Sequence, residues 1–262
     1  MVLTDTHTHL YYETDPAKLE GLMQRSLRNQ VSRLFLPCVN SNTLPLIFNL
    51  VKQYPQHCFA MLGLHPCDVK QTASAEIKNY LDELDTIHNV IAEHKIYAIG
   101  EIGLDLYWDK TMLAVQQQAF KIQIKWAKEL DLPIVIHCRD AFEETLEILK
   151  AEKDVRLRGI FHCFTGTAQQ AKEIIALNFY LGIGGVVTYK NSGLKEVLRD
   201  ISLENIVLET DSPYLAPIPY RGKTNESSFL VPIAQTIADI KEVTIEEVAR
   251  ITTENSIKIF GI

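Results

Sequence analysis

The chain contains 262 residues, of which 47% are hydrophobic and 23% are charged, the composition of an ordinary globular protein and not of a disordered one. A chain of this length buries roughly three quarters of its unfolded surface, so a full hydrophobic core is expected. The net charge of −7 argues against a broad basic face that wraps duplex DNA, but it allows a site that holds one or two phosphates through metals and a few cations.

Targeting signals and disulfides are not expected from the sequence. No uninterrupted apolar run reaches the ~20 residues of a membrane span, and the first residues lack the basic and apolar regions of a signal peptide. The five cysteines are odd in number and form no C-x-x-C pair. This usage indicates free thiols in a reducing compartment. We therefore expect a cytoplasmic protein without membrane association.

Short apolar runs alternate with longer amphipathic stretches along the whole chain. Eight runs have the length of a strand and are rich in β-branched or aromatic residues, which is typical of strands covered on both faces. They span residues 2–9, 33–39, 58–65, 96–104, 133–139, 158–164, 179–185 and 206–211.

The stretches between these runs carry helix signals. Asp15-Pro16 is an N-cap followed by proline at the first helical position, and the apolar face behind it comprises Leu19, Leu22, Met23 and Leu27. A second apolar stripe comprises Ile77, Leu81, Leu84, Ile87 and Ile91. A capping box, Thr244 with Glu247, begins a helix that continues through Val248 and Ile251.

This alternation predicts the fold class. Strands that alternate with helices form parallel βα units, and eight such units predict an α/β fold with one (β/α)8 TIM-like barrel over residues 1–262. The stretch 213–229 is predicted as a long loop after the last strand, over the active site.

A His-x-His pair stands at the end of the first predicted strand. Residues i and i+2 of a strand point to the same side, so the imidazoles of His7 and His9 should enter the barrel together. Two neutral ring nitrogens placed this way can bind one metal ion. The pair alone is equally compatible with two incidental polar residues near the N-terminus.

Further polar residues fall at the ends of other predicted strands. They are Glu101, His137, His162 and Asp211. Each alone is explained by a hydrogen-bonded histidine or a salt-bridged carboxylate, but the carboxyl ends of barrel strands form the face where this fold carries its chemistry. Coincidence would scatter such residues among helices and loops, where we place three histidines without an assigned role: His57, His88 and His94. We therefore predict one shared site.

Six ligands suit two divalent ions better than one. The predicted assignment is His7, His9 and Asp211 for one ion, His137 and His162 for the other, and Glu101 bridging both. Ions about 3.5–4 Å apart activate water and neutralise charge on a phosphoryl oxygen; Glu101 and Asp211 are the expected catalytic carboxylates, with Asp211 accepting the proton. The mixed nitrogen and oxygen set suits Mg²⁺, Mn²⁺ or Zn²⁺ without choosing among them.

Several segments resemble the signature segments of the TatD deoxyribonuclease family. They are Asp5-Thr6-His7-Thr8-His9, Gly63-Leu64-His65-Pro66, Gly100-Glu101-Ile102-Gly103-Leu104-Asp105, Ile136-His137-Cys138-Arg139-Asp140-Ala141, His162-Cys163-Phe164-Thr165-Gly166, Glu209-Thr210-Asp211-Ser212-Pro213-Tyr214, Arg221-Gly222-Lys223-Thr224-Asn225-Glu226 and Thr252-Thr253-Glu254-Asn255. The resemblance covers nearly the whole chain and implies a TIM-like barrel, two divalent ions, no organic cofactor, and hydrolysis of single-stranded DNA or 3′ ends, as a 3′–5′ exonuclease. It leaves the oligomeric state open, and a monomer is consistent with it.

Two positions depart from the family pattern. Cys67 stands where the family often has a second histidine, and Ser227 stands where proline usually follows the Asn-Glu pair. Neither position is a predicted metal ligand, so the departures bear on substrate preference and loop geometry.

A further set of residues is predicted to contact substrate. His65 ends the third predicted strand, and Arg139 shares the side-chain parity of His137, so both should face phosphate at the barrel mouth. Arg221, Lys223 and Asn225 lie on the loop above the site and would supply local positive charge and hydrogen bonds. The alternatives are a structural histidine, a salt-bridged arginine and a solvated loop.

Other neighbours of the site have predicted supporting roles. Glu209 has the parity of Asp211 and is expected to orient a ligand, or else to form a buried ion pair. Cys138 and Cys163 follow ligand histidines, so strand alternation points them away from the site, as small buried residues. Tyr107 and Trp108 are candidates for base stacking at the mouth, with simple loop packing as the alternative.

Three other functions fit parts of the pattern. A small-molecule amidohydrolase or esterase on the same barrel would use similar histidines, but many such enzymes bridge their metals with a carboxylated lysine where this chain has Glu101. A D-aminoacyl-tRNA deacylase would keep the fold and metals and change the substrate, because ester and phosphodiester need the same activated water. A non-catalytic metal-binding protein is the third.

Overall fold

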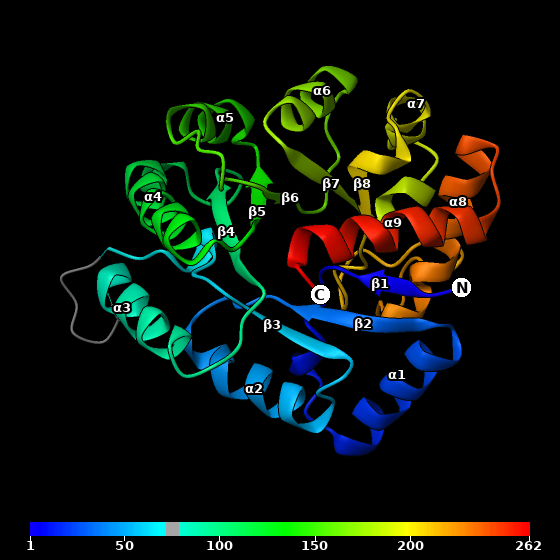
Figure 1. The fold of residues 1–262 in the computed structure, drawn as a ribbon, viewed down its shortest axis with the longest axis horizontal. Coiled ribbons are helices and arrows are strands. Elements are labelled where there is room, and N and C mark those ends of the chain that lie inside the picture. Colours follow the sequence, from blue (N-terminus) through cyan, green and yellow to red (C-terminus); the bar gives the residue numbers. More distant parts are fainter. Residues whose placement is uncertain (72–78) are drawn as a thin grey trace.

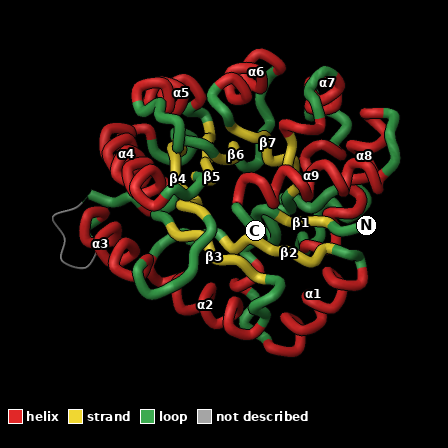
Figure 2. The backbone as a smooth tube through the Cα atoms, viewed as in Figure 1, coloured by secondary structure: helices red, strands yellow, loops and turns green. Residues whose placement is uncertain are grey.

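The computed structural model describes residues 1–71 and 79–262. Eight strands of this part pair in sequence order, each parallel to the next. They are β1 (Leu3–Asp5), β2 (Val31–Leu36), β3 (Cys58–Leu62), β4 (Ala98–Asp105), β5 (Ile134–Arg139), β6 (Gly159–Phe161), β7 (Phe179–Ile183) and β8 (Ile206–Leu208). The helices that alternate with them form an outer ring around the strands (Figure 1, Figure 2). They are α1 (Pro16–Arg28), α2 (Leu44–Gln53), α3 (Tyr80–Ile91), α4 (Leu113–Leu130), α5 (Phe142–Ala151), α6 (Ala168–Ala176), α7 (Leu194–Arg199), α8 (Leu230–Lys241) and α9 (Ile245–Phe260). The predicted (β/α)8 barrel is confirmed.

The barrel closes between its first and last strands, at residues that lie just beyond both. The Thr6 amide donates to the Leu208 carbonyl at 3.0 Å, and the Asp211 amide donates to the His7 carbonyl at 2.9 Å. Thr8 and Ser212 also form a parallel bridge between the two segments. Closure therefore brings the segments that follow β1 and β8 together at the carboxyl end of the barrel.

The core has two parts, inside and outside the strand ring. Inside, buried residues from six strands form one cluster with the end of α9, and the Phe260 ring stacks on Phe35 with centroids 3.7 Å apart. Outside, a larger cluster fills the space between strands and helices. α9 crosses the barrel near both termini (Figure 1), and Asn255 donates to the carbonyl of Ile206, the first residue of β8. α9 therefore covers the amino end of the barrel and leaves the carboxyl end for chemistry.

The predicted helix starts are observed, but two predicted apolar positions are wrong. Asp15 accepts hydrogen bonds from the first amides of α1, and Thr244 accepts one from Glu247 at the start of α9. Leu27 and Leu81 are exposed, at 37% and 48%. Leu27 follows the buried Ser26 and Leu81 follows the buried Tyr80, and one residue rotates a helical position by about 100°, so both leucines point off the buried face. Ile77 lies outside the described residues.

No helix within residues 1–71 and 79–262 has both the length and the apolar character that crossing a bilayer would require.

Candidate active site

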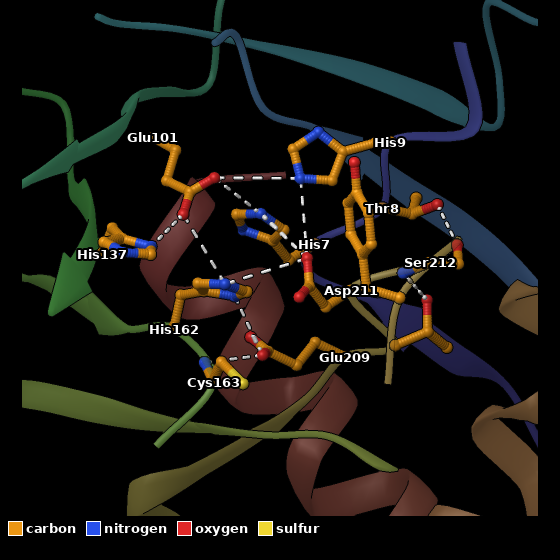
Figure 3. Close-up of polar contacts among 12 residues, drawn as sticks. His7, Thr8, His9, Glu101, His137, His162, Cys163, Glu209, Asp211 and Ser212 are labelled. Carbon is orange, nitrogen blue, oxygen red and sulfur yellow. Dashed lines mark hydrogen bonds and ion pairs between the residues drawn. The ribbon is translucent and has the colours of Figure 1, made fainter. Parts of the chain in front are cut away.

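The six predicted ligands converge at the carboxyl end of the barrel (Figure 3). The strands end earlier than the sequence predicted: β1 ends at Asp5, β6 at Phe161 and β8 at Leu208. His7, His162 and Asp211 therefore lie in the segments just beyond the strands, and Asp211 has a left-handed backbone, with φ of 55°. Strand alternation does not set the direction of these side chains; the turns after the strands do.

Glu101 occupies the centre of the site because of an irregularity in β4. The register between β4 and β5 shifts between Gly100 and Ile102, so Glu101 is the extra residue of a bulge, a feature that re-aims a side chain. Its Oε2 lies 3.2 Å from His7 Nε2 and 3.8 Å from His9 Nε2. The two carboxylate oxygens face different histidines (Figure 3), because Oε1 lies 2.9 Å from His137 Nδ1.

Asp211 faces three of the histidines from the opposite wall. Its Oδ1 lies 3.5 Å from His9 Nε2, 3.8 Å from His7 Nε2 and 3.9 Å from His162 Nε2. The rings of His7 and His162 stack with centroids 3.6 Å apart. The carboxylate oxygen and the ring nitrogens thus point into one small space.

The groups of ligand atoms differ from the predicted division into two sets. His7, His9 and Asp211 lie within 4.8 Å of one another, as the sequence suggested. His162 groups with His7 and Glu101, and its Nε2 also lies 3.7 Å from Glu101 Oε1, the oxygen that faces His137, so His162 has contacts with both predicted sets. The ring stacking of His162 on His7 places it between the two sets.

The outer ring nitrogen of His9 has a partner that leaves its inner nitrogen free. Tyr11 donates its hydroxyl hydrogen to the Pro37 carbonyl at 2.7 Å, so its oxygen accepts the Nδ1 proton of His9 at 2.8 Å. His9 Nε2 is then unprotonated where it faces the pocket. An outer partner of this kind fixes the tautomer and orientation of a metal-binding histidine.

Two carboxylates orient the other histidines. Asp105 Oδ2 lies 2.9 Å from His137 Nε2, and Glu209 Oε1 lies 2.9 Å from His162 Nδ1. Gly182 provides the room for Glu209, because a Cβ atom there would lie 2.3 Å from Oε2. Glu209 thus has the position predicted for it. No role was predicted for Asp105, although an acid at the carboxyl end of a barrel strand is the same signal that Glu101 carries.

The charge of the pocket fits divalent cations. The pocket holds four carboxylates, of which Glu101, Asp105 and Glu209 are buried and Asp211 is partly exposed, and in the described residues their ion-pair partners are all histidines. Burial alone would raise the pKa of Glu101, but His65, His7 and His162 hold it well below its ordinary value. Burial would lower the pKa of His162, yet Glu209, Glu101 and Asp211 raise it to about 10. Neither ring nitrogen of the buried His7 makes a hydrogen bond to any of the described residues. Buried negative charge beside free imidazole nitrogens is the donor set of a divalent-metal site.

His65 has a different character from the other histidines of the site. Its Nδ1 accepts a hydrogen bond from the Cys67 amide at 3.1 Å, so Nε2 carries the proton. Nε2 lies 3.4 Å from Glu101 Oε1 at the edge of the pocket. In this tautomer His65 is a hydrogen-bond donor toward the site and not a metal ligand.

The other predicted substrate residues lie in contrasting surroundings. Arg139 is exposed, with its guanidinium 3.7 Å above the Tyr107 ring, and Arg221 lies 4.5 Å above Tyr189. Asn225 is 3% exposed, and its amide nitrogen donates to two backbone carbonyls, those of Thr210 and Tyr214. Contact between the Asn225 amide and substrate would require these bonds to break.

The two cysteines that follow ligand histidines differ in direction. Cys138 packs against the hydrophobic cluster outside the strand ring, away from the pocket, as alternation predicted. For Cys163 alternation fails, because β6 has already ended and φ is 48°; its Sγ lies within 4.8 Å of ligand atoms of His162 and Glu209. Burial raises the pKa of Cys138 to about 11 and that of Cys163 well above its ordinary value, so neither is an activated thiolate.

Comparison with known proteins decides the family. The family model described as TatD related DNase matches residues 4–261, a span that includes every candidate ligand. The chain belongs to the TatD family. Similar relatives are the uncharacterized metal-dependent hydrolase YabD of Bacillus subtilis, 40% identical over 100% of both chains, and YcfH of Escherichia coli, also an uncharacterized metal-dependent hydrolase, 33% identical over 100% of this chain and 97% of its own. The crystal structure of the TatD homologue YJJV from Escherichia coli superposes with a TM-score of 0.89 at 26% identity, covering 99% of this chain and 98% of that one. This TatD protein is therefore a metal-dependent hydrolase with candidate His, Glu and Asp ligand clusters.

Proposed function

We propose that this TatD protein is a deoxyribonuclease that holds two divalent ions and removes nucleotides from the 3′ end of DNA. The observation that carries the proposal is the bridging position of Glu101. One of its oxygens faces His7 and His9, and the other faces His137. A carboxylate that offers each oxygen to a separate nitrogen group suits a pair of ions better than a single one.

The protein residues would divide the work as follows. Bound divalent ions supply Lewis-acid chemistry: they lower the pKa of water and neutralise charge that develops on a phosphoryl oxygen. Asp211 is the proposed proton acceptor, because its side chain is 14% exposed whereas those of Glu101 and Glu209 are 4% and 0% exposed. Asp211 is thus the carboxylate of these three that entering water and substrate reach most directly.

Hydrogen-bond donors at the pocket edge suit an anionic substrate. The Nε2 proton of His65 points toward the pocket beside Glu101. Arg139 comes from β5, two residues after His137, and its guanidinium is exposed. Hydrogen-bond donors bind phosphate oxygens, and a guanidinium does so through two parallel charged N–H groups.

The proposal is tested with end-labelled single-stranded DNA in Mg²⁺, Mn²⁺ or Zn²⁺, beside an EDTA control and a His137→Ala variant. We expect stepwise shortening from the 3′ end that both controls abolish, and the most active ion identifies the working metal. Circular dichroism of the variant separates a lost site from a lost fold.

The opposite result also has a defined meaning. Intact DNA under every condition, with metal bound stoichiometrically, would contradict the nuclease proposal. The same protein would then be assayed on D-aminoacyl-tRNA and on small esters, amides and lactones, which the same pocket chemistry could hydrolyse.

A further inference from the structure

Two large aromatic side chains stand exposed directly beside the ion pocket. Tyr107 and Trp108 follow the last residue of β4 by two and three positions, and they are 53% and 72% exposed. Their rings meet edge to face with centroids 4.9 Å apart. The alternative of simple loop packing therefore does not cover them, and much of the Trp108 side chain in particular is open at the barrel mouth.

One buried carboxylate fixes these aromatic residues relative to the pocket. Asp105 Oδ1 accepts hydrogen bonds from the amides of Tyr107 at 3.0 Å and Trp108 at 3.2 Å. Its other oxygen, Oδ2, lies 2.9 Å from His137 Nε2. The aromatic pair and a candidate metal ligand are therefore held by the same side chain, which sets their spacing.

A cation completes the cluster. The Arg139 guanidinium lies 3.7 Å above the Tyr107 ring and 5.6 Å from the Trp108 ring. Within the described ranges no carboxylate forms an ion pair with it, so the salt bridge considered from the sequence is not seen there. Stacking holds the guanidinium plane and leaves its N–H edge available for a phosphate. In a chain of net charge −7, this places positive charge locally where an anionic strand would need it.

We infer that Tyr107, Trp108 and Arg139 form a binding subsite that stacks an unpaired nucleobase and holds its phosphate beside the ion pocket. The inference rests on the proposed nuclease function. An aromatic face stacks any unpaired base, whereas a base in a duplex already has both faces covered by its neighbours. The subsite therefore binds strands irrespective of sequence but selects against paired ends.

The kinetic test compares a single-stranded oligonucleotide with one that carries abasic residues near its 3′ end. The wild type should lose about tenfold or more in kcat/KM on the abasic strand, the range expected from stacking of one base. Trp108→Ala should show that loss on the intact strand and little further loss on the abasic one. Leu130→Ala is the control, because it removes a side chain of 42% exposure at the end of α4. If Trp108→Ala keeps the wild-type preference for intact strands, the inference is wrong.

A binding measurement separates this inference from the nuclease proposal. The chain has two tryptophans, and Trp126 is 8% exposed, so a Trp126→Phe variant reports on Trp108 alone. Short oligothymidylate in EDTA should quench its fluorescence, and an abasic strand of equal length should not. Quenching without DNA cleavage by the wild type would overturn the nuclease proposal and keep the subsite. Cleavage without quenching would overturn the subsite and keep the nuclease.

Discussion

The contact between Asp105 and His137 offers a sharp test of how the site is built. Asp105 Oδ2 lies 2.9 Å from His137 Nε2, and Glu101 Oε1 lies 2.9 Å from Nδ1, so without a metal both ring nitrogens can donate to carboxylates. A metal ion at Nδ1 would require that nitrogen to lose its proton while Nε2 keeps its own on Asp105. In Asp105→Asn the remaining oxygen can keep the backbone amides of the following turn, so the side-chain NH₂ takes the place of Oδ2. A donor at that position favours the tautomer with its proton on Nδ1. That proton would occupy the nitrogen that faces the pocket.

The size of the effect follows from what such outer partners contribute. Their loss typically costs about 10–100-fold in metal affinity, or about 1.4–2.7 kcal/mol. We expect this loss for Asp105→Asn when apo-protein is titrated with Mn²⁺ or Zn²⁺ by calorimetry, with a parallel loss of turnover. Asp109→Asn is the matched control, because Asp109 is exposed and caps the short helical turn that starts at Lys110. Equal affinities of the two variants would refute the tautomer argument.

Three further outcomes follow from particular contacts. Glu101→Gln should lose more turnover than the ~100-fold typical of an outer partner, with unchanged circular dichroism; an unchanged rate and metal content would remove Glu101 from the mechanism. Gly103→Ala should destabilise the fold, because the Gly103 φ is 140° and a Cβ there would lie 2.0 Å from the His137 carbonyl oxygen. Backbone strain and overpacking each cost about 1–3 kcal/mol of unfolding free energy. An unchanged midpoint in denaturant titration would contradict this. Burial would raise the pKa of Glu226, but its bonds with Arg25, at 2.8 and 2.7 Å, hold the pKa below its ordinary value. That contribution is complete well above about pH 4.3 and is lost as pH falls through the lowered pKa, so the Tm difference between wild type and Arg25→Gln should shrink in acid; a constant difference would argue against the ion pair.

The sequence by itself determined the architecture and which residues form the site. Apolar periodicity is a local property, so the eight strands and the helices between them could be read without knowing any long-range contact. A barrel of this kind carries its chemistry at the carboxyl ends of its strands, and this rule selected residues from five separate strand runs. The structure brings all of them together.

Only the tertiary structure decided how those residues act. The Glu101 bulge is a register shift between β4 and β5, and no single strand pattern contains it. The proton on His65 Nε2, the role of Asp105 and the buried amide of Asn225 all depend on hydrogen-bond partners supplied by the fold. A strand pattern gives the side on which a residue lies. Tautomer, ligand grouping and exposure depend on atoms from distant segments, which meet only when the first and last strands close the barrel.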